Sequence, residues 1–161
     1  MDRLLPIAER IGALLKGRRE TIAVAESSSG GLVSAALLSV PGASAYFAGG
    51  AVVYTQQART ALLGITGAEM AGIRSASEPY AALLARTMRE RLGTTWGLAE
   101  TGAAGPSGNR YGDAAGHTCI AIGGPVEQSL TLETGIDGRV ANMRDFAKAT
   151  LDLLLAALQA D

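Results

Sequence analysis

Cysteine and histidine are almost missing from this chain of 161 residues, which contains one of each, Cys119 and His117. A disulfide within the chain needs two cysteines, and a metal site built on sulfur or imidazole ligands needs several such side chains. The sequence therefore excludes an internal disulfide and predicts no metal site. Cys119 lies in the apolar run 118–122, so we expect it to be a small, buried side chain.

Charge is also scarce, because only 18% of the residues are charged and the formal net charge is −1. The basic residues are scattered along the chain instead of forming the stripe that nucleic-acid backbones require, so nucleic acid is excluded as a partner. The hydrophobic content of 48% is typical of a well-buried globular protein. We expect one domain over residues 1–161, large enough to fold without a metal or a disulfide.

No segment has the pattern of a targeting or membrane-spanning sequence. Arg3, Glu9 and Arg10 interrupt the first apolar residues, which a secretory signal would not tolerate. Residues 27–58 carry no charge, but Pro41-Gly42 and the surrounding small polar residues divide this stretch into pieces too short to cross a bilayer. We therefore expect a cytoplasmic protein without membrane contact.

The spacing of apolar residues predicts strands that alternate with helices. Helices are expected over about 4–17, 31–40, 56–63, 77–92 and 138–160, and strands over 21–25, 50–54, 96–99, 119–122 and 128–132. This order favours a three-layer α/β/α sandwich with a mixed sheet of about five strands. The loops after strands 21–25 and 96–99 should then open onto the same crevice.

The loop at residues 26–31, Glu-Ser-Ser-Ser-Gly-Gly, is the most informative part of the chain. It joins a predicted strand to a helix N-terminus, where unpaired N–H groups and the helix dipole favour anionic groups. One of its hydroxyls is the best candidate nucleophile. Neither this loop nor residues 102–108 carries a known phosphate-binding fingerprint, so an anion site and a structural turn both remain open.

Several polar residues have a structural as well as a functional interpretation. Glu26 could react, or it could orient the amides and hydroxyls of its own loop. His117 is more often a structural histidine than a general base in such a position. Arg110 and Asp113 are expected to be solvated, and Tyr54 at the end of a strand could simply pack.

A set of segments matches, in order along the chain, the motifs of one known family. Residues 26–31 are similar to E-S-C-T-G-G, and residues 41–47 to P-G-S-S-A-Y-F. Residues 54–59 are similar to Y-S-N-E-A-K, and residues 101–108 to T-G-I-A-G-P-x-G. Shorter matches follow the same order at 62–64, 77–78 and 137–139. Nearly the whole chain thus resembles the CinA C-terminal domain family, the nicotinamide-nucleotide amidases of the PncC type.

The resemblance implies a reaction, a site and an assembly. The reaction is hydrolysis of the amide of nicotinamide mononucleotide to nicotinic acid mononucleotide and ammonia, with no cofactor, and the assembly is a homodimer. Ser27 would be the nucleophile, Tyr54 would belong to the catalytic residues, and Arg59 stands at the position of the family's lysine base. The implied substrate-binding residues are Glu26, Ser28, Ser29, Gly30, Gly31, Thr101, Gly102, Ala103, Gly105 and Arg139. Among them the N–H groups of 28–31 would bind the oxyanion, and Arg139 would reach the nucleotide phosphate.

Arg59 departs from the family pattern at the base itself, and the only lysines of the chain are Lys16 and Lys148. A buried lysine can be tuned to a pKa of about 7–8 and act as a base, whereas arginine stays protonated in proteins. Arg59 therefore cannot accept the serine proton. Glu100, where the family has an uncharged residue, is either the replacement base or an ion-pair partner of Arg59, and His117 is a further candidate base.

Two functions from different classes follow. In the first, the chain is an amidohydrolase acting on a nicotinamide-type nucleotide with a different base. In the second, the pocket persists but the chemistry is lost or altered, and the chain is a nucleotide-binding or regulatory module in which Arg59 holds a phosphate or carboxylate. A measurement of ammonia release from nicotinamide mononucleotide distinguishes these two functions.

Overall fold

The computed structural model describes residues 1–160 and contains a five-stranded sheet in the order β2-β1-β3-β4-β5. The strands are β1 (Ile22–Glu26), β2 (Phe47–Val52), β3 (Trp96–Ala103), β4 (His117–Gly123) and β5 (Gln128–Glu133). β1 pairs in parallel with β2 and β3, while β4 runs antiparallel to both β3 and β5. The predicted mixed sheet of five strands is confirmed.

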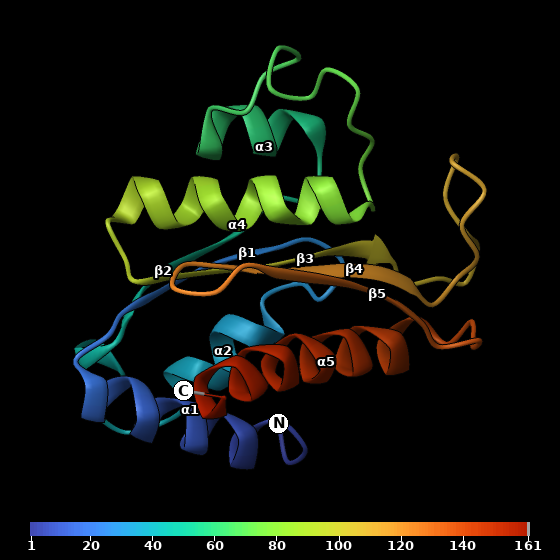
Figure 1. Cartoon of the computed structure of the whole chain (residues 1–161). Helices are drawn as coiled ribbons and strands as arrows, with labels where there is room; N and C mark the ends of the chain where they lie inside the picture. The colour runs from blue at the N-terminus through green and yellow to red at the C-terminus, as the bar shows by residue number, and fades with distance from the viewer. Residues whose placement is uncertain (161) are drawn as a thin grey trace.

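Helices cover both faces of the sheet and complete the three predicted layers (Figure 1). One face carries α1 (Leu5–Arg18), α2 (Leu32–Leu38) and α5 (Arg139–Gln159), and the other carries α3 (Gln56–Leu63) and α4 (Glu78–Leu92). α4 lies directly on the sheet, and α3 lies over α4 (Figure 1). A short 3-10 helix, η1 (Ala43–Ala45), precedes β2. Within residues 1–160 no helix is both long and apolar enough to cross a membrane.

Local signals set the ends of α3 and α4. The Ser77 hydroxyl accepts a hydrogen bond from the Tyr80 N–H at the start of α4, and the Thr55 hydroxyl accepts one from the Ala58 N–H at the start of α3. Each helix ends at a glycine with positive φ, Gly64 at 65° and Gly93 at 62°. Hydroxyl caps and left-handed glycines are the usual end signals, so the predicted bounds of both helices hold to within a residue.

Two predicted strands have different bounds in the structure. β2 lies at 47–52 rather than 50–54, because its pairing with β1 begins at Phe47 opposite Ile22. β3 continues past the predicted end at residue 99 to Ala103, since its antiparallel pairing with β4 extends to the Ala103–His117 pair. The apolar pattern misplaced these bounds because β2 has exposed edge positions and β3 contains polar residues.

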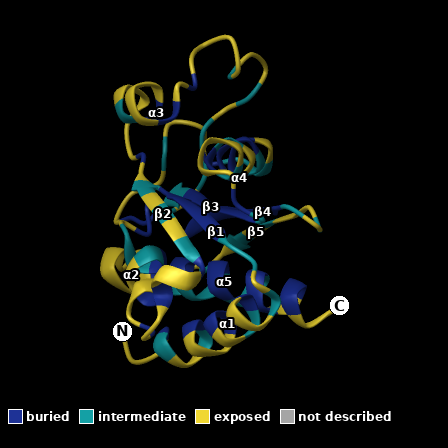
Figure 2. Cartoon of the chain, turned by 90° about the vertical axis from the view of Figure 1, so that its left-hand side faces the viewer, coloured by how far each residue is buried: buried dark blue, intermediate teal, exposed yellow. Residues whose placement is uncertain are grey.

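Two hydrophobic clusters lie on opposite faces of the sheet, and β1 contributes to both. Ile22 and Val24 face the cluster under α1, α2 and α5, whereas Ala23 and Ala25 face the cluster under α4. The central strands β1, β3 and β4 therefore form the buried middle layer of the molecule, while the edge strands β2 and β5 are partly exposed (Figure 2). Cys119 belongs to the second cluster and is 2% exposed, which confirms that it is a small buried side chain.

Candidate functional site

Two carboxylates lie side by side on the parallel strands β1 and β3, next to the β1–α2 loop. Ala25 pairs with Ala99 in the β1–β3 register, so the next residues, Glu26 and Glu100, are neighbours. Both side chains are fully buried. A buried carboxylate is costly unless it accepts hydrogen bonds, and both of these accept several.

Glu26 organises the start of α2. Its Oε1 accepts hydrogen bonds from the Ser29 hydroxyl at 2.8 Å and from the N–H groups of Gly31 and Val33, and its Oε2 accepts one from the Ser34 N–H at 2.9 Å. Gly31, the N-cap of α2, has no side chain to do this, and helix N-termini favour a negative charge. The structural interpretation of Glu26 is confirmed. Its side chain has no exposed surface, and its contact with substrate stays a prediction.

Glu100 also binds this loop, residues 26–31, named the serine loop here for its three consecutive serines. Its Oε2 accepts hydrogen bonds from the Ser27 N–H at 3.2 Å and the Ser29 N–H at 2.8 Å. Its Oε1 accepts from the Thr118 hydroxyl at 2.9 Å and from the Ser28 hydroxyl. Among the described residues Glu100 makes no ion pair with Arg59, so the predicted pair is wrong. A continuous β3–β4 ladder places Glu100 under the serine loop instead.

The three serines therefore differ in their access to solvent and in their partners. Ser28 is 4% exposed and Ser29 is fully buried, whereas Ser27 is half-buried. The Gly30 N–H donates to the Ser27 carbonyl, and the Gly31 N–H donates to Glu26. Within residues 27–31 only the Ser28 N–H has no hydrogen-bond acceptor in the described chain. The N–H of the residue after a nucleophile is a common oxyanion donor.

Gly102, Ala103 and Gly105, which follow the core of β3, line a cavity of about 230 Å³ together with Tyr54 and Arg139. Arg139 donates hydrogen bonds to the Gly105 carbonyl at 2.6 Å and to the Tyr54 hydroxyl at 3.1 Å. The structure thus brings together five of the residues that the sequence predicted. Their functional roles remain predictions.

Thr101 and Asn142 are two buried polar residues that hold neighbouring segments by hydrogen bonds. Thr101 is 2% exposed, and its hydroxyl accepts a hydrogen bond from the Ala76 N–H at 3.3 Å. Asn142 is fully buried and donates hydrogen bonds to the carbonyls of Ala104 and Ile136. Sequence reasoning missed Asn142, and its only signal was a polar residue on the apolar face of α5.

Arg59 lies in a second, larger cavity of about 510 Å³, which shares Tyr54 with the first. Arg59 is 8% exposed, its Nε has no hydrogen-bond partner among the described residues, and its guanidinium carbon lies 5.6 Å from the centre of the Tyr80 ring. Burial raises the pKa of the Tyr80 hydroxyl, although Arg59 lowers it in part. Ser27 lines neither this cavity nor the first one.

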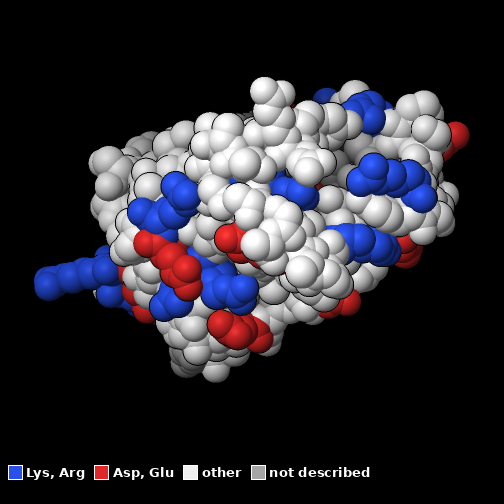
Figure 3. Space-filling view, turned by 90° about the horizontal axis from the view of Figure 1, so that it is seen from above, with Lys and Arg blue, Asp and Glu red and all other residues white. Residues whose placement is uncertain are grey.

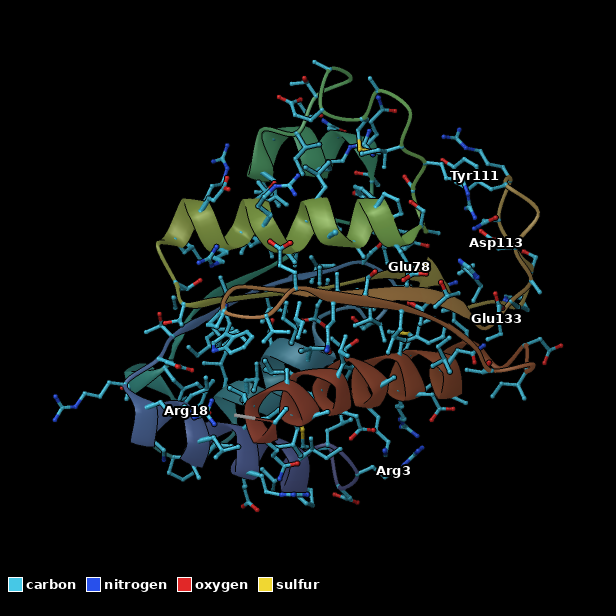
Figure 4. All side chains as sticks on the ribbon, viewed as in Figure 1. Arg3, Arg18, Glu78, Tyr111, Asp113 and Glu133 are labelled. Atoms are coloured by element: carbon cyan, nitrogen blue, oxygen red, sulfur yellow. The ribbon has the colours of Figure 1, made fainter. Side chains whose placement is uncertain are left out.

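His117 anchors the loop at residues 104–116 and makes no contact with the serine loop. Its Nε2 lies 2.9 Å from the Ala76 carbonyl, its Nδ1 contacts the Glu133 carboxylate, and Asp113 lies 3.6 Å away. Burial lowers the pKa of the imidazole, but these acceptors outweigh it and raise the pKa above its usual value. Figure 4 shows Asp113 on the projecting loop and Glu133 below it, near the end of β5.

Asp113 is not solvated as expected. Arg74 forms a bidentate ion pair with it, in which Nη1 lies 2.7 Å from Oδ2 and Nη2 lies 3.1 Å from Oδ1. This pair holds the pKa of the Asp113 carboxyl below its usual value. The neighbouring Arg110 is exposed and lies 5.1 Å from the centre of the Tyr111 ring. Within residues 1–160 no cluster of three or more His, Cys, Asp and Glu side chains could hold a metal.

Comparison with known proteins agrees with this architecture. A CinA-like protein of Gloeobacter violaceus is 39% identical over 150 residues, which are 92% of this chain and 35% of that protein. A CinA-like protein of Synechocystis is 42% identical over 76% of this chain and 30% of its own length. The chain therefore spans about a third of the length of these curated relatives.

Solved structures match over nearly their full length. A competence-damaged protein (CinA) superfamily protein from Klebsiella pneumoniae has a TM-score of 0.91 at 21% identity, covering 98% of this chain and 99% of that one. The competence/damage inducible protein from Agrobacterium tumefaciens has a TM-score of 0.86 at 26% identity, covering 98% and 96%. The sequence profile of the CinA C-terminal domain matches residues 4–158. This chain belongs to the CinA C-terminal domain family.

Proposed function

We propose that this chain is an amidohydrolase that converts nicotinamide mononucleotide to nicotinic acid mononucleotide and ammonia, with Ser27 as the nucleophile. The observation that carries the proposal is the exposure of the serines in the serine loop, together with the hydrogen bonds of its N–H groups. Ser27 is its most exposed serine, and the following N–H, that of Ser28, is the only N–H within residues 27–31 without an acceptor in the described chain. A nucleophile followed by an available N–H donor fits acyl transfer.

The proposed chemistry has two stages. The Ser27 hydroxyl gives its proton to a base and attacks the amide carbon, and the Ser28 N–H stabilises the oxyanion. The base then returns the proton to the leaving nitrogen, which departs as ammonia as the acyl-enzyme forms. Water then hydrolyses the ester and releases the acid. Arg59 cannot act as the base, because guanidinium stays protonated. We keep Glu100 as the candidate, since its Oε2 lies 3.2 Å from the Ser27 backbone nitrogen.

Ammonia release from nicotinamide mononucleotide by the purified chain tests this proposal. Removal of the Ser27 hydroxyl should lower turnover by about 10³-fold or more. Ser39→Ala is the matched control, because Ser39 lies at the other end of α2 and its hydroxyl donates only to the Ala36 carbonyl. Turnover that persists in Ser27→Ala would exclude Ser27 as the nucleophile.

The second candidate function is a nucleotide-binding or regulatory module on the same fold. The cation of Arg59 at the position of the family's base favours it. This function predicts that nicotinamide mononucleotide raises the melting temperature without ammonia release, and that Arg59→Lys gains turnover by supplying a base. Rapid turnover by the natural chain would rule it out.

We further propose, on the family resemblance alone, that the chain forms a homodimer and acts in the cytoplasm. Light scattering at micromolar concentration tests the first point. A monomeric mass at every concentration would contradict the dimer.

A further inference from the structure

Arg59 is a buried cation with an incomplete set of partners. Its side chain is 8% exposed, and its Nε is the one buried side-chain N or O within residues 1–160 that has no hydrogen-bond partner. A buried donor without an acceptor destabilises the folded state, and an uncompensated buried charge does so more strongly. A group retained at that cost in a cavity wall needs an explanation.

The fold aims Arg59 into the cavity from a fixed position. Arg59 and Leu63 are the buried residues of α3 and lie one turn apart on the face toward α4. On the α4 side, the Tyr80 ring packs against the guanidinium at 5.6 Å. The site is therefore built from two helices, with Arg59 held between them.

A second cation completes the cavity from the loop at 104–116. Arg110 and Tyr111 line the cavity, and the adjacent Asp113 fastens this loop to Arg74 by its two-pronged ion pair. Figure 3 views the molecule from the side of α3 and shows basic side chains toward the end where this loop projects in Figure 1. Two guanidinium groups thus share one cavity.

The rest of the wall lacks a counter-charge but supplies hydroxyl groups. None of the lining residues is acidic. The lining residues with hydroxyl groups are Tyr54, Thr55, Ser75, Tyr80 and Tyr111. Guanidinium groups and hydroxyl donors around a cavity without a carboxylate are suited to an anion.

We propose that the Arg59 cavity binds the phosphate group of a small phosphate monoester. Two monovalent guanidinium groups match a phosphate dianion better than a single carboxylate, and the planar guanidinium fork fits phosphate oxygens. The volume of about 510 Å³ accommodates a small organic molecule along with the phosphate. This inference rests on the second candidate function, the nucleotide-binding module, and names the ligand of its site. It does not require amide hydrolysis.

Calorimetric titration of the whole chain with ribose 5-phosphate tests the inference. This probe carries no amide, so the result is independent of any amidase activity. We expect saturable binding at one site, weakened about tenfold or more in Arg59→Gln because a charge-assisted hydrogen bond is lost. Without ligand, the melting temperature of Arg59→Gln should equal or exceed that of the natural chain, since the variant removes an uncompensated buried charge.

Two further variants locate the site. Arg86→Gln, a charge-matched change on the exposed surface of α4, should leave the affinity unchanged. Arg139→Gln alters the smaller cavity and tests whether the phosphate binds there instead. The inference is overturned if ribose 5-phosphate does not bind, if Arg59→Gln binds it as tightly as the natural chain, or if only Arg139→Gln loses affinity. Acetate binding more tightly than ribose 5-phosphate would overturn the choice of phosphate.

Discussion

Single side chains decide which of three consecutive serines is available for reaction. Ser28 and Ser29 direct their hydroxyls to Glu100 and Glu26, inside the loop. Ser27 contributes its backbone N–H to Glu100 and remains partly accessible. The two glutamates therefore separate Ser27, the proposed nucleophile, from the two serines that bind inside the loop.

Glu100→Gln is predicted to lower stability as well as turnover. The Glu100 carboxylate accepts four hydrogen bonds, and an amide has one acceptor oxygen only. At least one buried donor then loses its partner, which should reduce the free energy of unfolding in urea by about 1–3 kcal/mol. Glu127→Gln on the exposed surface should change it little.

The same variant tests the role of Glu100 as a base. If Glu100 accepts the serine proton, turnover by the folded fraction of Glu100→Gln should vanish. An unchanged rate would remove Glu100 from the mechanism, and an unchanged unfolding free energy would contradict the hydrogen bonds described above.

Residue roles that depend on the local sequence could be predicted, and roles that depend on distant partners could not. The apolar run around Cys119 indicated burial, and the loop around Glu26 suggested that this carboxylate could orient the loop's own amides and hydroxyls. The partners of Glu100 lie 71–73 residues away in the serine loop and 18 residues away at Thr118. Only the sheet register brings them together, so the sequence suggested an ion pair with Arg59 that does not form.

Among the structural elements, the loop at 104–116 depends most on a titratable contact. Both ring nitrogens of His117 face oxygen acceptors, the Ala76 carbonyl and the Glu133 carboxylate. Only the doubly protonated imidazolium donates from both nitrogens. His117 therefore connects the loop to both the 74–76 segment and β5 only while its ring carries the second proton.

Stability should therefore fall as the pH rises above neutrality. The folded-state pKa of His117 is raised above its usual value, so its contribution is complete below about pH 6.5 and is lost as the pH rises through the folded-state pKa. His117 is the only histidine, so the difference between the natural chain and His117→Gln isolates this effect. The free energy of unfolding, measured from pH 5.5 to 8.5, should converge for the two proteins at high pH. A constant difference over that range would contradict the assignment.

Element boundaries were predictable where the chain carries its own end signals. Ser77 and Gly93 marked α4 correctly, because capping is a local interaction. β2 and the second half of β3 gave no such signal. Their lengths are set by the strands beside them, which the apolar pattern of a single segment does not contain.

At the scale of the whole molecule, α4 packs on the sheet with its backbone close to the backbone of β3. A Cβ added at Gly97 in β3 would lie 2.0 Å from the Ala85 carbonyl oxygen of α4. That atom belongs to the backbone and cannot rotate away. The small residues Ala23, Ala25, Ala99 and Ala121 under this helix extend the same close packing.

Gly97→Ala is predicted to destabilise the chain by at least about 2 kcal/mol, because α4 must move away from the sheet. Gly123→Ala is the matched control. Gly123 pairs with Gly97 across β3 and β4, and its added Cβ would meet nothing closer than the Arg86 nitrogen at 3.9 Å. Gly123→Ala should change stability by less than about 1 kcal/mol. Equal losses in both variants, measured by urea unfolding, would refute this account of the packing.

The pair of buried glutamates also gives the molecule an electrical orientation. Glu26 and Glu100 accept hydrogen bonds from neutral groups only, so acidic side chains lie under the serine loop. Basic side chains, Arg59, Arg110 and Arg139, line the two cavities. A zwitterionic ligand would align along this field. The proposed ligand, a nicotinamide nucleotide, would turn its cationic pyridinium ring toward Ser27 and its phosphate toward the arginines, before any specific contact forms.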